Sequence, residues 1–263
     1  MSAGTKLLPW GLFGGVLMAA LVLACNGNGG EEPAVIGPLD VSRSCQLLRE
    51  ADAYRYSFEY LIESPEPAEP LGTEDVGDPA FGLPAGSPDF TFGQQVEGSI
   101  VNPDSAEMVI TTLGTAGGLP LLFVAGREWT MLGGDWIETP SGGVLPFPPT
   151  DVCDAIVGDL DASGVVPIRE EINGTEALRF RVEQADINPI GKLFGGQTGP
   201  TGQTDLLQTH TVQAWIGVKD GRPLRLEAES VGTYPSGREL RLELALEIED
   251  FNDKGISIRP PTE

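Results

Sequence analysis

Apolar and polar residues alternate with a period of two through most of this chain, which is the pattern of half-buried strands. In the clearest run, residues 240–248, five aliphatic side chains alternate with mostly charged ones. Aromatic and polar residues alternate in the same way at 54–60. Further runs lie at 96–101, 107–112, 121–125, 128–132, 136–138, 178–182, 212–218 and 224–228. Because each run would have one apolar, buried face and one polar, solvent-exposed face, the pattern predicts an antiparallel sheet.

Turn and helix signals divide these runs. Asn173-Gly174 is the preferred pair for a type I′ hairpin turn. Short helices are predicted at 45–51 and at about 151–160, where the apolar residues of the second segment lie on one face. Nine or ten strands with two short helices predict a mainly β, α+β fold, in which helices close one large curved sheet.

Two segments interrupt the strand pattern. Residues 63–92 are rich in proline, glycine and acidic residues, and residues 187–208 are rich in glycine, glutamine and threonine. Both are interpreted as long mobile loops inside the domain, although the first has the composition of a linker between two units as well. Both are candidate gates of a binding site.

The N-terminal segment has the layout of a bacterial lipoprotein export signal. Lys6 precedes an uncharged apolar run from Leu7 to Ala24, which ends at Cys25. Cleavage after Ala24 would remove residues 1–24 and leave Cys25 as the lipidated first residue. The alternative is an uncleaved membrane helix, because 18 apolar residues are close to the ~20 that span a bilayer. In either case the domain faces outward, and residues 25–40 are interpreted as a flexible tether.

Charge and cysteine content narrow the function classes. The chain carries 16 basic and 39 acidic residues, a formal net charge of −23, so neither nucleic acid nor anionic headgroups are expected partners. With Cys25 assigned to the lipid, Cys45 and Cys153 remain. In an oxidising compartment such a pair usually forms a disulfide, here worth ~4 kcal/mol, and two buried thiols are the alternative. A metal site is disfavoured because His210 is the only histidine.

Three short stretches resemble the LolA-like superfamily, and within it the mycobacterial envelope lipoproteins of the LppX and LprG type. Residues 123–129 with Trp136 are similar to the family's paired strands that end in tryptophan. Residues 171–175 are similar to its turn after the central helix, and residues 214–225 to its "WID…G.P.R" strand-turn-strand. The chain departs from the family in the acidic loop at 63–92 and in lacking a threonine-rich strand after Asn173-Gly174.

The resemblance implies a half-barrel of antiparallel strands over residues 41–255, whose concave apolar face is covered by helices and holds acyl chains of a lipid or lipoprotein. Residues 256–263 would form a tail. The candidate pocket residues are aliphatic and come from the last three strands: Val212, Ile216, Leu224, Leu226, Leu242 and Leu244. An ordinary filled core would show the same pattern, so both interpretations stay open.

Catalytic and metal motifs are sparse. The chain has no G-x-S-x-G elbow, P-loop or dinucleotide fingerprint, and no cofactor is expected. Asp159, Asp161, Ser163 and Glu170 match part of a calcium loop, but Pro167 occupies its ninth position and no exiting helix follows. A turn from helix to strand is the preferred interpretation.

These observations predict a non-enzymatic lipoprotein, anchored to the cell membrane on its extracytoplasmic side, that binds an apolar ligand for transfer or presentation. An envelope scaffold or sensor with a filled core is the alternative, and an enzyme with an unrecognised site ranks third.

Overall fold

The computed structural model describes residues 41–64, 90–139, 145–157, 165–183, 207–233 and 238–261, together with Pro189 and Leu193. All of them belong to one compact unit, residues 38–263. Within these residues the chain forms two helices, α2 (Val41–Glu50) and α3 (Pro149–Val157). It also forms eleven strands: β1 (Ala53–Ser64), β2 (Phe90–Val101), β3 (Ser105–Thr112), β4 (Leu119–Val124), β5 (Arg127–Leu132), β6 (Asp135–Thr139), β7 (Ile168–Ile172), β8 (Thr175–Glu183), β9 (Leu207–Gly217), β10 (Pro223–Thr233) and β11 (Glu239–Glu249).

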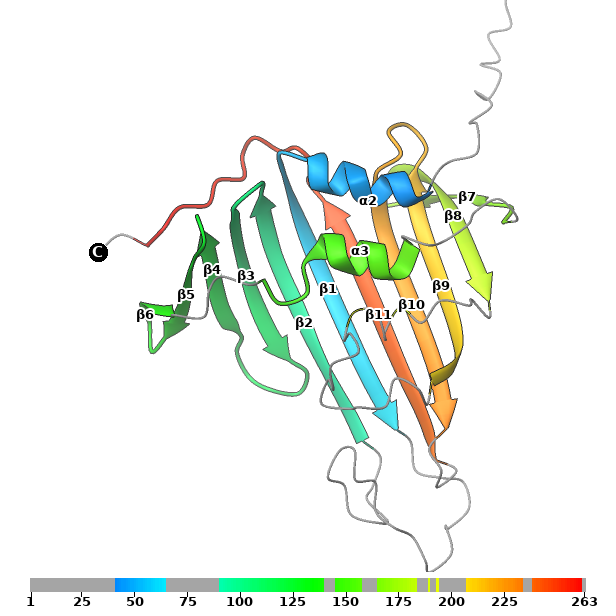
Figure 1. Cartoon of the computed structure of the whole chain (residues 1–263), viewed down its shortest axis with the longest axis horizontal. Helices are drawn as coiled ribbons and strands as arrows, with labels where there is room; N and C mark the ends of the chain where they lie inside the picture. The colour runs from blue at the N-terminus through cyan, green and yellow to red at the C-terminus, as the bar shows by residue number, and fades with distance from the viewer. Residues whose placement is uncertain are drawn as a thin grey trace, which may run out of the picture. The chain divides into compact units, whose positions relative to one another are not determined.

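All eleven strands join one antiparallel sheet in the order β6-β5-β4-β3-β2-β1-β11-β10-β9-β8-β7 (Figure 1). In one half of the sheet, strands β1 to β6 follow one another from the centre to one edge. In the other half, strands β7 to β11 follow one another from the opposite edge to the centre. The halves meet where β1 pairs with β11, from Arg55 opposite Glu249 to Glu63 opposite Arg241. Strands β6 and β7 remain separate edges, so the sheet is open, as in a half-barrel, and is not a closed barrel.

The two faces of the sheet differ in polarity because the side chains of each strand alternate. On β11 the even-numbered residues 240–248 are buried, and the odd-numbered residues between them are partly exposed. The same alternation holds on β1 from Tyr54 to Ser64. Helices α2 and α3 cross the face that carries the buried set, which we call the inner face (Figure 1). The opposite, polar face is the outer face.

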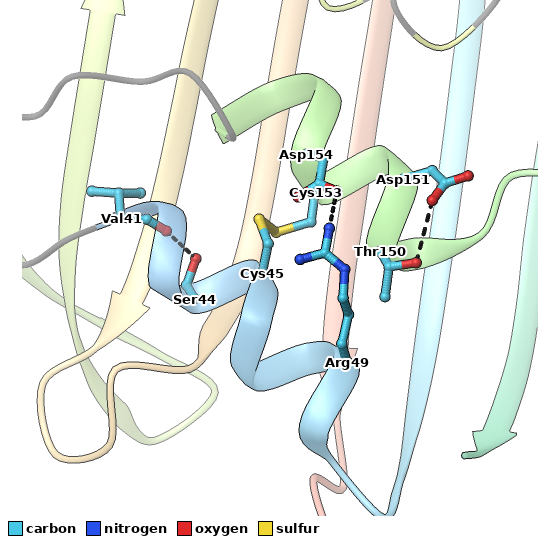
Figure 2. Close-up of a disulfide and its surroundings, with 8 residues drawn as sticks. All are labelled: Val41, Ser44, Cys45, Arg49, Thr150, Asp151, Cys153 and Asp154. Carbon is cyan, nitrogen blue, oxygen red and sulfur yellow. Dashed lines mark hydrogen bonds and ion pairs between the residues drawn. A yellow bond between two sulfur atoms is a disulfide. The ribbon is translucent and has the colours of Figure 1, made fainter. Parts of the chain in front are cut away.

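The two helices are joined to each other on the inner face. Cys45 of α2 and Cys153 of α3 form the disulfide that the sequence predicts, with Cα atoms 5.6 Å apart and a sequence separation of 108 (Figure 2). An ion pair between Arg49 and Asp154 lies beside it. Both cysteines are fully buried. The bond therefore links the start of the unit to its middle and ties the two helices into one cover.

The predicted fold class is confirmed: a mainly β, single antiparallel sheet with two short helices. Several boundaries differ from the sequence-based expectation, among them the start of α2, which is Val41 and not Cys45. β1 and β2 stay paired as far as Ser64 opposite Phe90, so the ladder extends into the predicted loop 63–92, and β9 starts at Leu207 inside the predicted loop 187–208. β7 was not predicted as a strand, because three of its five residues are charged and only its pairing with β8 shows its conformation.

One predicted turn is found as expected. Asn173 and Gly174 join β7 to β8 with φ angles of 50° and 76°. Such positive φ angles at both central residues are what a type I′ turn requires, and asparagine and glycine adopt them most readily. The sequence pattern here fixes the hairpin, although the strand before it was not recognised.

Candidate apolar binding face

The inner face is built from rows of side chains that the strand register places opposite one another. One row contains Val212, Ala228, Leu244 and Tyr60, taken from β9, β10, β11 and β1 in turn. The next row contains Ala214, Leu226, Leu246 and Phe58. All eight side chains are at most 7% exposed. The centre of the sheet therefore presents a continuous apolar surface toward the helices.

Five of the six predicted pocket residues lie together on this face. They are buried members of three neighbouring strands: Val212, Ile216, Leu226, Leu242 and Leu244. Leu224 is placed differently. A β-bulge between Pro223 and Arg225 inserts it as an extra residue, and it packs in a separate small cluster with Ala177 and Trp215. A bulge breaks the alternation that predicted a shared face.

An aromatic group occupies the inner face next to α3. Phe147, two residues before the helix begins, has its ring centroid 5.3 Å from that of Phe58 and 5.5 Å from that of Tyr60. Tyr60 in turn lies 6.0 Å from Phe92 of β2. Burial raises the pKa of the Tyr60 phenol. These rings extend the apolar surface from β11 across β1 to β2.

The helices are small relative to the face that they cover. The five central strands, β2, β1, β11, β10 and β9, have 11 or 12 residues each. At about 3.4 Å per residue and about 4.8 Å between strands, their inner face measures roughly 900 Å². Helices of 10 and 9 residues, about 15 Å long and about 10 Å wide, shield roughly 300 Å². The two helices therefore cover about a third of the central inner face.

One polar pair interrupts the apolar rows. His210 of β9 and Ser230 of β10 lie opposite each other, with 2.8 Å between Nδ1 and Oγ. His210 is 8% exposed and Ser230 is fully buried. Burial lowers the pKa of His210, so the imidazole is neutral at neutral pH. The pair belongs to the row of Leu242 and Ile62.

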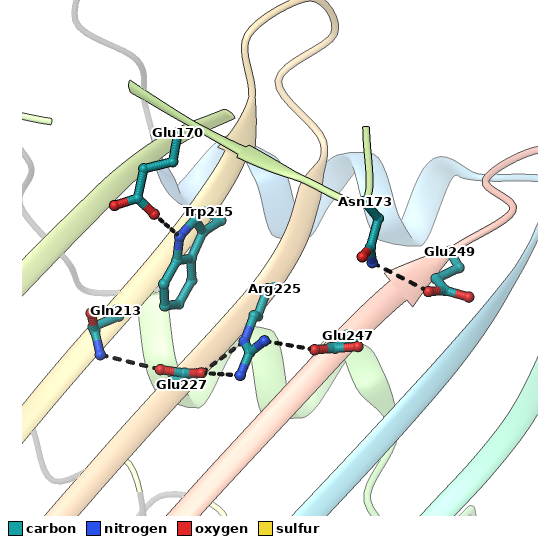
Figure 3. Close-up of polar contacts among 8 residues, drawn as sticks. All are labelled: Glu170, Asn173, Gln213, Trp215, Arg225, Glu227, Glu247 and Glu249. Atoms are coloured by element: carbon teal, nitrogen blue, oxygen red, sulfur yellow. Dashed lines mark hydrogen bonds and ion pairs between the residues drawn. The ribbon is translucent and has the colours of Figure 1, made fainter. Parts of the chain in front are cut away.

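The outer face is a network of charges. Arg225 pairs with Glu227 and Glu247, and Trp215 donates its indole N–H to Glu170 over 2.9 Å (Figure 3). Grooves open on this face, and two of them are lined entirely by described residues. The larger, of about 510 Å³, is lined in part by carboxylates: Glu97, Glu107, Glu247 and Glu249. The smaller, of about 350 Å³, lies over β9, β10 and β11 and is also lined by glutamates and arginines. The larger groove is also lined by the apolar side chains of Val109, Pro120 and Trp136, so its lining is mixed.

The remaining predicted site residues are less informative. Cys25, Asp159, Asp161 and Ser163 lie outside the described residues, as do most of the two predicted gating loops. Glu170, the fourth member of the predicted calcium loop, lies in β7, where it accepts the hydrogen bond from Trp215 and pairs with Arg179. Among the described residues, no group of acidic, histidine or cysteine side chains is arranged to hold a metal ion.

Sequence reasoning missed two features of the inner face. His210 precedes Val212 by two residues and Ser230 follows Ala228 by two, so the period of two would have placed both beside the predicted pocket residues. Phe147 had no such signal, because it lies in a proline-rich segment outside any strand. Its ring contacts Phe58 and Tyr60 of β1, which are far from it in the sequence, so these contacts could not be predicted from local sequence.

No helix among the described residues has the length and apolar character needed to cross a membrane. No protein-family model matches this chain, and no curated protein matches it.

Solved structures to which the chain is similar include LprF from Mycobacterium bovis, at 12% sequence identity, covering 86% of this chain and 97% of LprF with a TM-score of 0.46. A LolA superfamily protein from Nitrosomonas europaea is 12% identical, with 83% of this chain and 96% of that chain covered and a TM-score of 0.27. A chain of the Pseudomonas aeruginosa MucA/MucB complex is 10% identical, with coverage of 85% and 100% and a TM-score of 0.23.

Proposed function

We propose that this protein is a lipoprotein, anchored by a lipid on Cys25 to the extracytoplasmic side of the cell membrane, that binds the acyl chain of a lipid or lipoprotein on its inner face for transfer or presentation. The observation that supports this most directly is the mismatch between the inner face and its cover. The described helices shield about a third of the central apolar surface, and the rows beyond them, although buried, are apolar and wide enough for a hydrocarbon chain to lie against them.

Burial of an acyl chain against the rows of Leu226, Leu244 and Phe58 would supply the binding free energy. Removal of apolar surface from water contributes roughly 25 cal/mol per Å². The disulfide between Cys45 and Cys153 holds α2 and α3 together as one cover, so a guest can enter without separating the helices from each other. This arrangement suits a carrier that loads and unloads.

A second candidate function is an envelope scaffold or sensor that acts through protein contacts. The observation in its favour is the low exposure of the inner-face side chains: Leu226 and Leu246 are fully buried, and Ala228 is 3% exposed. Such values also describe a filled core, in which packed side chains leave no room for a guest. The two candidates therefore differ in whether the face has room for a guest.

Ala228→Trp tests this difference directly. Ala228 lies on the inner face between Val212 and Leu244, so a tryptophan there projects into the space that an acyl chain would occupy. The carrier predicts that residues 38–263, purified without detergent, carry stoichiometric lipid in native mass spectrometry and solvent extracts. It further predicts that Ala228→Trp loses this lipid while keeping its melting temperature.

The scaffold predicts the opposite result. A filled core has no room for the indole, and overpacking costs about 1–3 kcal/mol of stability. Ala245→Trp, on the outer face of the neighbouring strand, is the matched control and is expected to change neither lipid content nor stability. A wild-type chain that stays free of lipid after incubation with envelope lipids, together with a destabilised Ala228→Trp, would overturn the carrier proposal.

A further inference from the structure

His210 and Ser230 form a buried, hydrogen-bonded polar pair within the rows that β9 and β10 contribute to the inner face. Leu242, Ile62 and Phe92 continue the same row across β11, β1 and β2. Burying a polar group costs free energy of folding unless the group is hydrogen-bonded. A polar pair on an apolar surface is therefore a candidate for a functional contact. Ser230 satisfies only one of the two ring nitrogens of His210.

The direction of the hydrogen bond follows from the burial of the two residues. If Nδ1–H donates to Ser230, the serine O–H has no acceptor among the described residues, and its side chain is fully buried. If the serine O–H donates to Nδ1, the imidazole carries its proton on Nε2, and the residue that keeps an unused donor is the more accessible of the two. In the second arrangement, in which the serine donates, no donor of the fully buried serine is left unpaired. This arrangement is therefore favoured.

Nε2 is then an unpaired donor that keeps some accessible surface, because it is not among the fully buried atoms that lack a partner in the described residues. Within the part of the chain that the structure describes, no hydrogen bond is formed to this atom, and the side chain is 8% exposed. Burial lowers the pKa of His210, so the imidazole donates as a neutral group and carries no charge into the apolar face. A neutral single donor suits a carbonyl oxygen.

We propose that His210, oriented by Ser230, is the polar anchor that donates a hydrogen bond from Nε2 to the carbonyl oxygen of an acyl ligand bound on the inner face. The inference rests on the proposed function and makes it more specific: the ligand is a fatty acid or a fatty acyl ester, and its carbonyl end lies at the row of Leu242 and Ile62. Its hydrocarbon lies along the rows of Leu244 and Leu246.

Three fluorescent probes of equal chain length separate the anchor from the apolar face: pyrenedecanoic acid, its methyl ester, and pyrenedecane, which has no carbonyl group. Binding of each to residues 38–263 is measured by pyrene emission, in the wild type and in His210→Phe. The acid and the ester are expected to bind His210→Phe about two- to twelvefold more weakly, which corresponds to the loss of one hydrogen bond of about 0.5–1.5 kcal/mol. Pyrenedecane is expected to bind both chains equally.

Two further variants keep the result interpretable if His210→Phe folds poorly. His210→Gln retains a side-chain N–H donor and is expected to recover part of the preference for the carbonyl probes. Thr211→Val, the next residue on the opposite face, is the matched control and should leave all three affinities unchanged. Circular dichroism melting checks each fold.

The outcomes distinguish the two proposals. Failure of all three probes to bind the wild type overturns the carrier proposal and the anchor with it. Binding of all three with the same affinity, or an equal loss for all three in His210→Phe, overturns the anchor and leaves an apolar carrier without a polar contact. Loss for the acid alone would restrict the anchor to free fatty acids, and loss for both carbonyl probes supports it as stated.

Discussion

The guanidinium of Arg225 stands over the ring of Trp215, with its central carbon 5.6 Å from the ring centroid. The two residues lie opposite each other on β10 and β9. The indole N–H of Trp215 donates to Glu170, which also pairs with Arg179. A large aromatic side chain, 7% exposed on the otherwise charged outer face, is therefore held by polar contacts on two sides (Figure 3).

Trp215→Phe should lower the free energy of unfolding by about 1–2 kcal/mol, because the phenyl ring keeps much of the packing but cannot donate to Glu170. Urea denaturation followed by circular dichroism measures the change. Gln213→Ala, which removes an amide that donates to Glu227 on the same face, is the control and should change stability by less. Equal stability of Trp215→Phe and the wild type would show that the indole hydrogen bond contributes nothing.

The disulfide is expected to contribute more than any single polar contact. Joining residues 108 positions apart removes chain entropy from the unfolded state, worth about 4–5 kcal/mol on the loop-closure model. The double variant Cys45→Ala, Cys153→Ala should lose this amount in denaturant titrations. Reduction of the wild type with a thiol should produce the same loss. A loss below about 1 kcal/mol would mean that the unfolded chain is already compact in this region.

The sequence predicts those structural features that are encoded by neighbouring residues, such as the conformation of a strand and the face that its side chains occupy. The alternation at 240–248 fixes both the conformation of β11 and the face that its leucines occupy, because one residue of slip would expose all of them. β7 escaped prediction because charged residues on an edge strand carry no such signal. Strand order is not local either: β1 pairs with β11 across nearly the whole chain, and no turn motif encodes that pairing.

The candidate site was predictable to the same extent. Val212, Ile216, Leu226, Leu242 and Leu244 followed from periodicity and share the inner face. Leu224 did not, because the bulge that moves it depends on how β10 meets β9 and not on the alternation within β10. The disulfide followed from compartment and cysteine count.

Phe147 provides a test of backbone strain. Its φ is 52°, in the left-handed region that residues other than glycine rarely adopt, and its ring packs on Phe58 and Tyr60. Phe147→Ala should lose about 2 kcal/mol, because the ring contacts disappear while the strain remains. Phe147→Gly removes the same ring, but glycine adopts this φ freely, so it should be less destabilising than alanine by up to about 1 kcal/mol. A glycine variant that is less stable than the alanine variant would contradict this account.

The last prediction concerns pH. Burial lowers the pKa of His210 below the ordinary value of 6.5, so the folded chain binds this proton less readily than the unfolded chain does. The stability that this group contributes is therefore fully present above about pH 6.5 and is lost as the pH falls through the lowered, folded-state pKa. Below that pKa both states are protonated, and the loss stops growing.

His210→Gln isolates this contribution, because glutamine keeps a hydrogen-bonding side chain but does not titrate, and all carboxylates are common to both chains. We expect the wild type to lose stability relative to His210→Gln between pH 7 and pH 5, measured by urea denaturation at half-unit steps. The opposite slope would mean that the folded state favours the imidazolium, and a carbonyl or carboxylate would then have to face it in the free protein. Parallel curves would mean that His210 reaches water as easily in the folded chain as in the unfolded one, which its 8% exposure opposes.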